Sequence, residues 1–150
     1  MHWVPVVEVD MLIRRRVNEV WDAFVDPDRI TKFWLARSTG RLEPRAVVTW
    51  GFKIAGAEAE VKVVDAVPGE LLDLRWEDDQ PLRISFEGRG GSTLVTVRVT
   101  DFGGDAPAAD AAETMSGFTL MLASLKMWLE HGIEGDLMYD KFPDADYADR

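Results

Sequence analysis

The amino-acid sequence predicts an α+β fold in which a curved antiparallel sheet wraps around one long C-terminal helix. Three observations lead to this prediction. A strand-like segment near the N-terminus is followed by two short helical segments, strands and turns alternate through the middle of the chain, and a long apolar helix follows them. This order is typical of α+β domains, in which helices cover one face of an antiparallel sheet.

The N-terminal part of the chain predicts one strand and two short helices. Over residues 6–13, apolar residues alternate with Glu8 and Asp10, which is the period of a half-buried strand. The spacing then becomes helical over VNEVWDAFVDPDRITKFW, but Asp26-Pro27 interrupts it because proline disfavours helical geometry in the residue before it. We expect a second short helix after this break, carrying Ile30, Phe33 and Trp34.

The middle of the chain, residues 37–102, predicts an antiparallel meander. Turn residues such as Pro68-Gly69 and Gly90-Gly91 separate short segments in which apolar and polar residues alternate. Such alternation means that one face of the sheet is covered and the other meets water. The residues expected on the covered face are Val7, Val9, Met11, Ile13, Val48, Trp50, Phe52, Ala59, Val61, Val63, Leu72, Leu74, Trp76, Leu82, Ile84, Phe86, Val95, Val97 and Val99.

The long helix is expected over residues 108–131, which is roughly 36 Å at 1.5 Å per residue. A helical projection places a set of apolar residues within one arc of about 80°, which we expect to face the sheet. These residues are Met115, Phe118, Leu122, Leu125 and Leu129. A second strip lies away from that arc, with the small residues Gly117 and Ser124 flanked by Met121 and Trp128 on one side and by Leu120 and Met127 on the other. Either the segment DLMYDKFP or a second copy of the chain, in a homodimer, could cover this strip.

Length and composition fit one domain over residues 1–150, with an irregular tail from about residue 133. No run reaches the roughly 18 uncharged apolar residues of a membrane span. The N-terminus, MHWVPVVEVD, lacks the basic start and long apolar stretch of a signal peptide. We therefore expect a cytoplasmic protein without a membrane span.

Charge and residue usage exclude several classes of site. A formal net charge of −10 disfavours nucleic-acid binding, which depends on neutralising phosphates. The absence of cysteine excludes disulfides, thiolate nucleophiles and thiolate metal ligands. Only His2 and His131 are present, so a three-histidine metal site is impossible, and we expect no metal and no cofactor. His131 fits a solvated position in the last turn of the long helix.

The predicted inner face of the sheet contains no ionisable residue and therefore no candidate for general acid-base catalysis. Its aromatic residues can form either a solid core or the wall of a ligand cavity, and a cavity is favoured for the set as a whole. Charged residues that could lie at a cavity mouth are Arg37, Lys53, Asp101, Asp110 and Glu113, and none of them is singled out as catalytic. The run Glu77-Asp78-Asp79 reads as a solvated turn rather than a metal site.

Taken together, these segments resemble the START-like (SRPBCC) helix-grip domains, in the branch that includes the C-terminal domain of the activator of Hsp90 ATPase and polyketide cyclases. The resemblance spans roughly residues 7–142. Its carriers are Val20-Trp21-Asp22-Ala23-Phe24 with Asp26-Pro27, the pair Phe33-Trp34, Pro68-Gly69-Glu70-Leu71-Leu72 ending in Trp76, Ser92-Thr93-Leu94-Val95-Thr96-Val97, and Gly117-Phe118 leading through Leu122 and Leu125-Lys126 to Leu129-Glu130-His131-Gly132. Two departures from the family pattern are Arg15-Arg16 in place of Ala-Pro, and Phe118 in place of tryptophan.

The resemblance implies an elongated cavity between the curved sheet and the long helix, because members of this superfamily enclose such a space and bind lipids, hormones or polyketides in it. We expect it to be lined by Phe33, Trp34, Trp50, Phe52, Trp76, Phe86, Met115, Phe118 and Leu122. The first hypothesis is therefore that the chain binds a small hydrophobic ligand, such as a lipid, a polyketide or an aromatic molecule. The alternatives are an enzyme of the cyclase, hydratase or isomerase type acting on such a ligand, and a co-chaperone-like module that binds a protein.

Overall fold

The computed structural model describes residues 4–147, so His2 lies outside the described residues. Its elements, in chain order, are β1 (Val7–Ile13), α1 (Val17–Val25), the 3-10 turn η1 (Ile30–Lys32), β2 (Arg37–Ser38), β3 (Val47–Gly51), β4 (Glu58–Val67), β5 (Leu71–Trp76), the short turn η2 (Glu77–Asp79), β6 (Gln80–Arg89), β7 (Ser92–Val99), α2 (Pro107–His131) and α3 (Leu137–Asp140). The predicted α+β helix-grip fold is confirmed.

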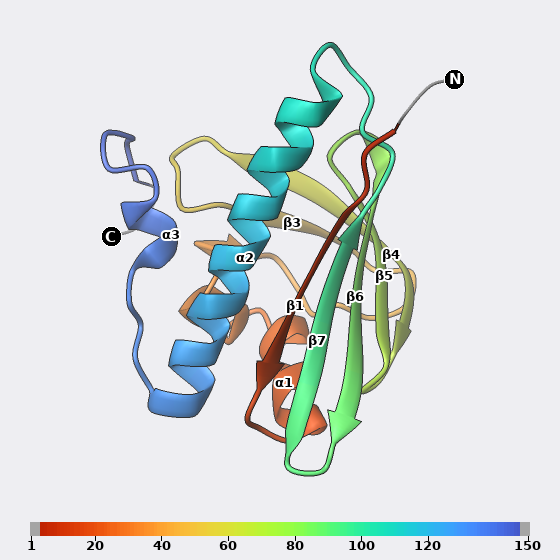
Figure 1. The fold of residues 1–150 in the computed structure, drawn as a ribbon, viewed down its shortest axis with the longest axis vertical. Coiled ribbons are helices and arrows are strands. Elements are labelled where there is room, and N and C mark those ends of the chain that lie inside the picture. Colours follow the sequence, from red (N-terminus) through yellow and green to blue (C-terminus); the bar gives the residue numbers. More distant parts are fainter. Residues whose placement is uncertain (1–3, 148–150) are drawn as a thin grey trace.

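The strands form one antiparallel seven-stranded sheet in the order β1-β7-β6-β5-β4-β3-β2. The sheet curls, α2 runs across its concave side, and α1 closes one end (Figure 1). None of the helices described over residues 4–147 combines the length and the apolar character needed to cross a membrane. Because α2 lies on the concave side of the sheet, the sheet and this helix share one interior (Figure 1).

One predicted element is shorter than expected. The second short helix is a single turn over Ile30–Lys32, and Phe33 and Trp34 come after its end. Phe33 leaves helical geometry with a φ of −135°, and the chain is extended by Arg37, where β2 begins. A segment this short gains too few backbone hydrogen bonds to continue as a helix by itself.

The strand register explains the predicted inner face. In β1 and β7, Val7 pairs with Val99 and Val9 with Val97, so these apolar side chains share one side of the pleat. On the outer side of the sheet, the Asp73 side chain is buried and only 9% exposed. Its carboxylate accepts hydrogen bonds from Arg75 at 2.8 Å and Arg83 at 3.3 Å, which satisfies the charge.

The face that α2 turns toward the sheet differs slightly from the predicted arc. Phe118, Leu122 and Leu125 are buried as expected, but Met121 is also fully buried and Met115 is 45% exposed. Met115 shares a side of the helix with Lys126, eleven residues later, and Lys126 donates to the Leu12 carbonyl at the edge strand β1. That side of α2 thus faces the edge of the sheet, where no further strand covers it.

The last turn of α2 is fastened to the end of β1. The Glu130 carboxylate accepts hydrogen bonds from the Arg14 backbone N–H at 2.8 Å and from Lys126 at 2.6 Å, and its side chain is 7% exposed. Burial alone would raise the pKa of Glu130, but these donors hold the pKa below its ordinary value. Gly132 ends the helix in the left-handed conformation, with a φ of 68°, which glycine adopts without steric cost.

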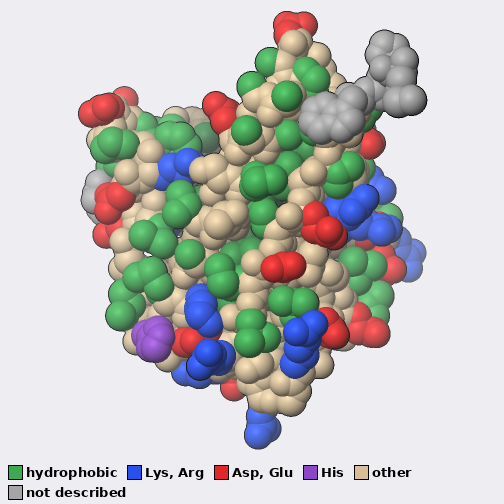
Figure 2. Space-filling model, in the orientation of Figure 1, with side chains coloured by type: hydrophobic (Ala, Val, Ile, Leu, Met, Phe, Trp, Pro, Cys, Tyr) green, Lys and Arg blue, Asp and Glu red, His purple; other side chains and the backbone are tan. Residues whose placement is uncertain are grey.

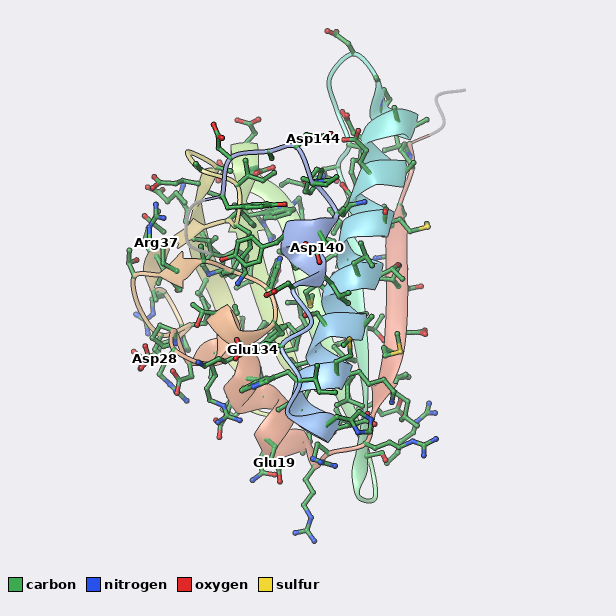
Figure 3. The ribbon with its side chains drawn as sticks, turned by 90° about the vertical axis from the view of Figure 1, so that its left-hand side faces the viewer. Glu19, Asp28, Arg37, Glu134, Asp140 and Asp144 are labelled. Carbon is green, nitrogen blue, oxygen red and sulfur yellow. The ribbon has the colours of Figure 1, made fainter. Side chains whose placement is uncertain are left out.

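The C-terminal segment folds back on α2, so α3 lies between α2 and the loops on the far side of the molecule (Figure 3, where Asp140 marks α3). Tyr139 is 6% exposed, Met138 packs against the core, and Ser124 of the small-residue strip is buried. The Lys141 ammonium donates to the Ser116 hydroxyl at 2.9 Å. The part of the strip around Ser124 is therefore covered by the chain's own tail, the first of the two predicted occupants.

Candidate functional site

A cavity of about 620 Å³ lies between the sheet, the N-terminal half of α2 and the returning tail. We call it the aromatic cavity. Its lining residues are Trp34, Phe52, Trp76, Glu77, Ala112, Glu113, Thr114, Ser116, Gly117, Phe118, Met138, Lys141 and Phe142. Figure 2 shows that hydrophobic side chains gather along α2 and toward α3 on the corresponding face of the molecule.

Aromatic rings from separate elements meet at the floor of this cavity. The Phe118 ring lies 5.6 Å from both Trp34 and Trp76, and Phe52 lies 6.3 Å from Trp76, measured between ring centroids. The rings are tilted or edge-to-face, which is the favourable geometry for aromatic pairs. The rings meet because β3 and β5 finish at the same end of the sheet, where the chain faces α2.

The opposite half of the interior is solid. Phe86 packs edge-on against Trp21 at 5.3 Å and Phe24 at 5.6 Å, so side chains of α1 fill the space between this end of the sheet and the helix. Trp50 is fully buried and packs on Trp34 at 4.8 Å. Within the described residues, the Trp50 indole N–H has no hydrogen-bond partner.

The structure divides the predicted pocket residues accordingly. Trp34, Phe52, Trp76 and Phe118 line the aromatic cavity. The others lie elsewhere: Phe33 stacks on Trp128, Trp50, Phe86 and Leu122 are in the packed core, and Met115 is on the exposed side of α2. The division follows from α1, whose aromatic residues occupy the end of the sheet that would otherwise be hollow.

Gly117 makes room in the wall formed by α2. A methyl group placed on this residue would meet no atom within 4 Å outside its own neighbourhood. Glycine in the middle of a helix costs roughly 0.5–1 kcal/mol relative to alanine, and packing does not require it here. The residue therefore keeps space open beside Phe118 at the expense of helix stability.

The turn after β5 places a carboxyl group on the cavity wall. Glu77 follows Trp76 directly, and Asp78 and Asp79 have positive φ values of 56° and 59°, which reverse the chain so that Gln80 pairs with Trp76. Burial raises the pKa of Glu77, and the neighbouring Asp78 carboxylate raises it further. A carboxyl group with a raised pKa in a cavity wall is a candidate proton donor or acceptor.

The sequence does not reveal Glu77 as a site residue, because the run Glu77-Asp78-Asp79 is typical of a solvated turn. The signal that could have found it is its position immediately after Trp76, an inward-facing aromatic residue at the end of a strand. A residue there continues the wall of the interior even though it already belongs to the turn.

The charged residues predicted for a cavity mouth separate into three groups. Glu113 lines the aromatic cavity. Asp101 and Asp110 line a neighbouring space of about 590 Å³, which shares Glu77 and Glu113 with the aromatic cavity and which we call the acidic cleft.

Neither of the two predicted cations lines the aromatic cavity, although the space that Lys53 borders shares Trp76 and Glu77 with it. Lys53 borders a side space of about 240 Å³, and its ammonium lies 4.6 Å from the centroid of the Tyr139 ring. Arg37 pairs with Glu58 and lies on the side of the molecule away from α2 (Figure 3).

This arrangement is suited to binding an apolar body against aromatic rings, with polar contacts available from Glu77, Glu113, Thr114, Ser116 and Lys141. Ligand pockets typically combine these features in volumes of about 300–1,000 Å³.

A family model described as activator of Hsp90 ATPase homolog 1-like protein matches residues 14–130. The chain belongs to this family. The predicted resemblance is thereby confirmed, and the match covers α1, the strands β2 to β7 and nearly all of α2. A comparison with curated proteins gave no significant match.

Solved structures share this fold. SSP2350 from Staphylococcus saprophyticus is 28% identical, with a TM-score of 0.78 over 86% of this chain and 94% of its own. DynU16, a protein in the dynemicin biosynthetic locus, is 23% identical, with a TM-score of 0.80 over 90% of this chain and 50% of its own. Aha1 from Colwellia psychrerythraea, whose solution structure is that of a dimer, is 17% identical, with a TM-score of 0.73 over 85% of this chain and 98% of its own.

Proposed function

We propose that this chain binds a small hydrophobic molecule in the aromatic cavity, with an aromatic, polyketide-like or lipid-like body lying against Trp76 and Phe118. The observation that carries the proposal is the open space of about 620 Å³ lined by the rings of Phe52, which follows β3, Trp76 at the end of β5 and Phe118 of α2. A ligand that buries about 200 Å² of apolar surface there would gain about 5 kcal/mol from the hydrophobic effect. Part of that gain offsets the lost freedom of the ligand, so shape and polar contacts set the final affinity.

Gly117 offers a direct test, because a larger side chain at this position fills the cavity without disturbing the core. We expect the neutral fluorescent probe N-phenyl-1-naphthylamine to bind the natural protein. We expect Gly117→Leu to lower its affinity at least tenfold. The matched control is Gly117→Ala, which improves helix propensity and leaves most of the space open.

Thermal unfolding of both variants shows whether the fold is intact. Unchanged probe affinity in a folded Gly117→Leu protein would place the probe elsewhere and contradict the proposal. Native mass spectrometry of gently purified protein provides a second readout, since a retained small molecule should be lost in the same variant.

A second candidate is an enzyme of the cyclase, hydratase or isomerase type. The observation that favours it is Glu77, whose raised pKa and place on the cavity wall suit proton transfer to a bound apolar substrate. Reactions of this type also gain from holding a flexible substrate in one conformation away from water. Loss of turnover in Glu77→Gln, with the affinity for the neutral probe N-phenyl-1-naphthylamine unchanged, would favour the enzyme over the binding protein.

Protein binding and homodimer formation stay predictions. The tail already covers the strip on α2 around Ser124, so a dimer would need another surface, such as the exposed Val6, Leu12 and Met115 beside the edge strand β1. Light scattering on the purified protein measures the oligomeric state, and a concentration-independent monomer mass would contradict the dimer.

A further inference from the structure

The charges on the wall of the aromatic cavity are unevenly placed. Glu77 and Glu113 line it, and Lys141 is the one cation that does so among the described residues. The Lys141 ammonium is engaged by the Ser116 hydroxyl at 2.9 Å and lies 5.5 Å from the Phe142 ring centroid. Within residues 4–147, neither glutamate has a hydrogen-bond or ion-pair partner, so both carboxylates are free to bind a ligand.

The same two glutamates connect the aromatic cavity to the acidic cleft. That cleft is also lined by Asp78, Asp101 and Asp110, and by no lysine or arginine of the described chain. A molecule that extends from the ring floor toward the cleft therefore passes from an apolar surface into a region of negative charge. Anionic ligands would be repelled at this boundary, whereas cations would be attracted.

The aromatic rings of the cavity also favour a positively charged ligand. The faces of tryptophan and phenylalanine carry negative electrostatic potential and attract ammonium groups. Trp76 stands directly before Glu77 in the chain, and both residues line the aromatic cavity. Burial raises the pKa of Glu77, and the neighbouring Asp78 carboxylate adds to this effect.

We propose that the ligand of the aromatic cavity is an organic cation, with an apolar or aromatic body on Trp76 and Phe118 and an ammonium group between Glu77 and Glu113. This inference rests on the proposed hydrophobic-ligand function and adds the charge of the ligand to it. Glu77 and Glu113 are then specificity-determining residues, because the rings alone would accept neutral and charged molecules of the same shape.

The test uses three probes with the same naphthalene body: 1-naphthylmethylammonium, 1-naphthalenemethanol and 1-naphthoate. Isothermal titration at neutral pH and low salt should give the tightest binding for the ammonium, about tenfold tighter than for the alcohol, and the weakest for the carboxylate. In Glu77→Gln and Glu113→Gln, the ammonium should lose most of this advantage, while the affinity for the alcohol stays the same.

Glu60→Gln is the matched control, because it removes the same charge from an exposed position on β4 and should change none of the affinities. If the alcohol binds as tightly as the ammonium, or the carboxylate binds most tightly, the inference about charge is overturned and the proposed hydrophobic-ligand function stands. If none of the three probes binds and Gly117→Leu has no effect on N-phenyl-1-naphthylamine, both are overturned. A retained ammonium preference in the two glutamine variants would also overturn the roles given to Glu77 and Glu113.

Discussion

The indole of Trp76 lies 5.6 Å from the ring of Phe118, which joins the end of β5 to the middle of α2. This contact separates the packed half of the interior from the half that is open. One side of it is filled by α1 and Phe86, and the other is the aromatic cavity. The stability of the fold and the shape of the candidate site therefore depend on the same pair of residues.

Phe118→Ala tests this double role. Phe118 is 4% exposed and contacts two tryptophan rings, so its truncation should lower the free energy of unfolding by about 3–5 kcal/mol and enlarge the cavity. Urea denaturation measures the loss. Met115→Ala, on the exposed side of the same helix, should change the stability by less than about 1 kcal/mol. Equal losses in the two variants would show that Phe118 is not part of a packed contact.

Neutralising the buried carboxylate of Asp73, on the outer face of the sheet, should lower the free energy of unfolding more than neutralising the exposed carboxylate of Glu87. Asp73 pairs with Arg75, two residues later on β5, and Glu87 pairs with Arg89, two residues later on β6. The Asp73 side chain is 9% exposed, whereas that of Glu87 is 62% exposed. Asp73→Asn should cost about 1–3 kcal/mol in denaturant unfolding, and Glu87→Gln less than about 0.5 kcal/mol.

The cost of Asp73→Asn should also depend on pH. Burial alone would raise the pKa of Asp73, but the hydrogen bonds from Arg75 and Arg83 hold it below its ordinary value. A lowered pKa means that the unfolded chain binds the proton more readily, so the ionised carboxylate stabilises the fold above the ordinary pKa. The difference between natural and variant protein should therefore shrink as the pH falls through the folded-state pKa. A cost that stays constant down to strongly acidic pH would contradict this account.

Glu77→Gln should stabilise the fold at neutral pH, whereas Asp73→Asn destabilises it. The pKa of Glu77 is raised in the folded chain, so ionising it costs stability at neutral pH, and the cost vanishes below the pKa of the unfolded chain. Removing the charge should therefore raise the free energy of unfolding at neutral pH, by less than about 1 kcal/mol for a partly exposed group. Thermal unfolding across the acidic to neutral range measures it, and a variant less stable than the natural protein at neutral pH would sink the prediction.

Truncation after Gly135 should damage both the fold and the site. It removes the buried Tyr139, together with Met138, Lys141 and Phe142 from the cavity wall. We expect a lower unfolding temperature, weaker binding of N-phenyl-1-naphthylamine, and self-association through the uncovered strip on α2.

The control for this truncation ends after Tyr147, whose hydroxyl donates to the Tyr139 and Phe142 carbonyls, so the shorter deletion keeps the described tail contacts. Thermal unfolding and light scattering compare the two proteins. Full stability and a monomer mass after truncation at Gly135 would show that the tail is not part of the packed structure.

The sequence by itself determined the fold, because the period of apolar residues is a local property of strands and helices. The alternation around Val95, Val97 and Val99 fixes which side of β7 faces inward, and the spacing of Phe118, Leu122 and Leu125 fixes the face of α2. Both faces are buried as predicted, except that on α2 Met115 is exposed and Met121 is buried. The family resemblance rests on the same local patterns and was confirmed for the same reason.

Only the tertiary structure decided where the interior is solid and where it is open. Phe86 and Phe52 have the same pattern in sequence, yet α1 packs on Phe86 and leaves Phe52 at a cavity, a difference set by contacts between distant segments. Glu77 belongs to the cavity wall because β5 ends beside α2, and Ser124 is buried because the tail returns across the helix. Periodicity reports which side of an element turns inward, whereas the filling of the space it turns toward depends on the side chains that the whole chain brings there.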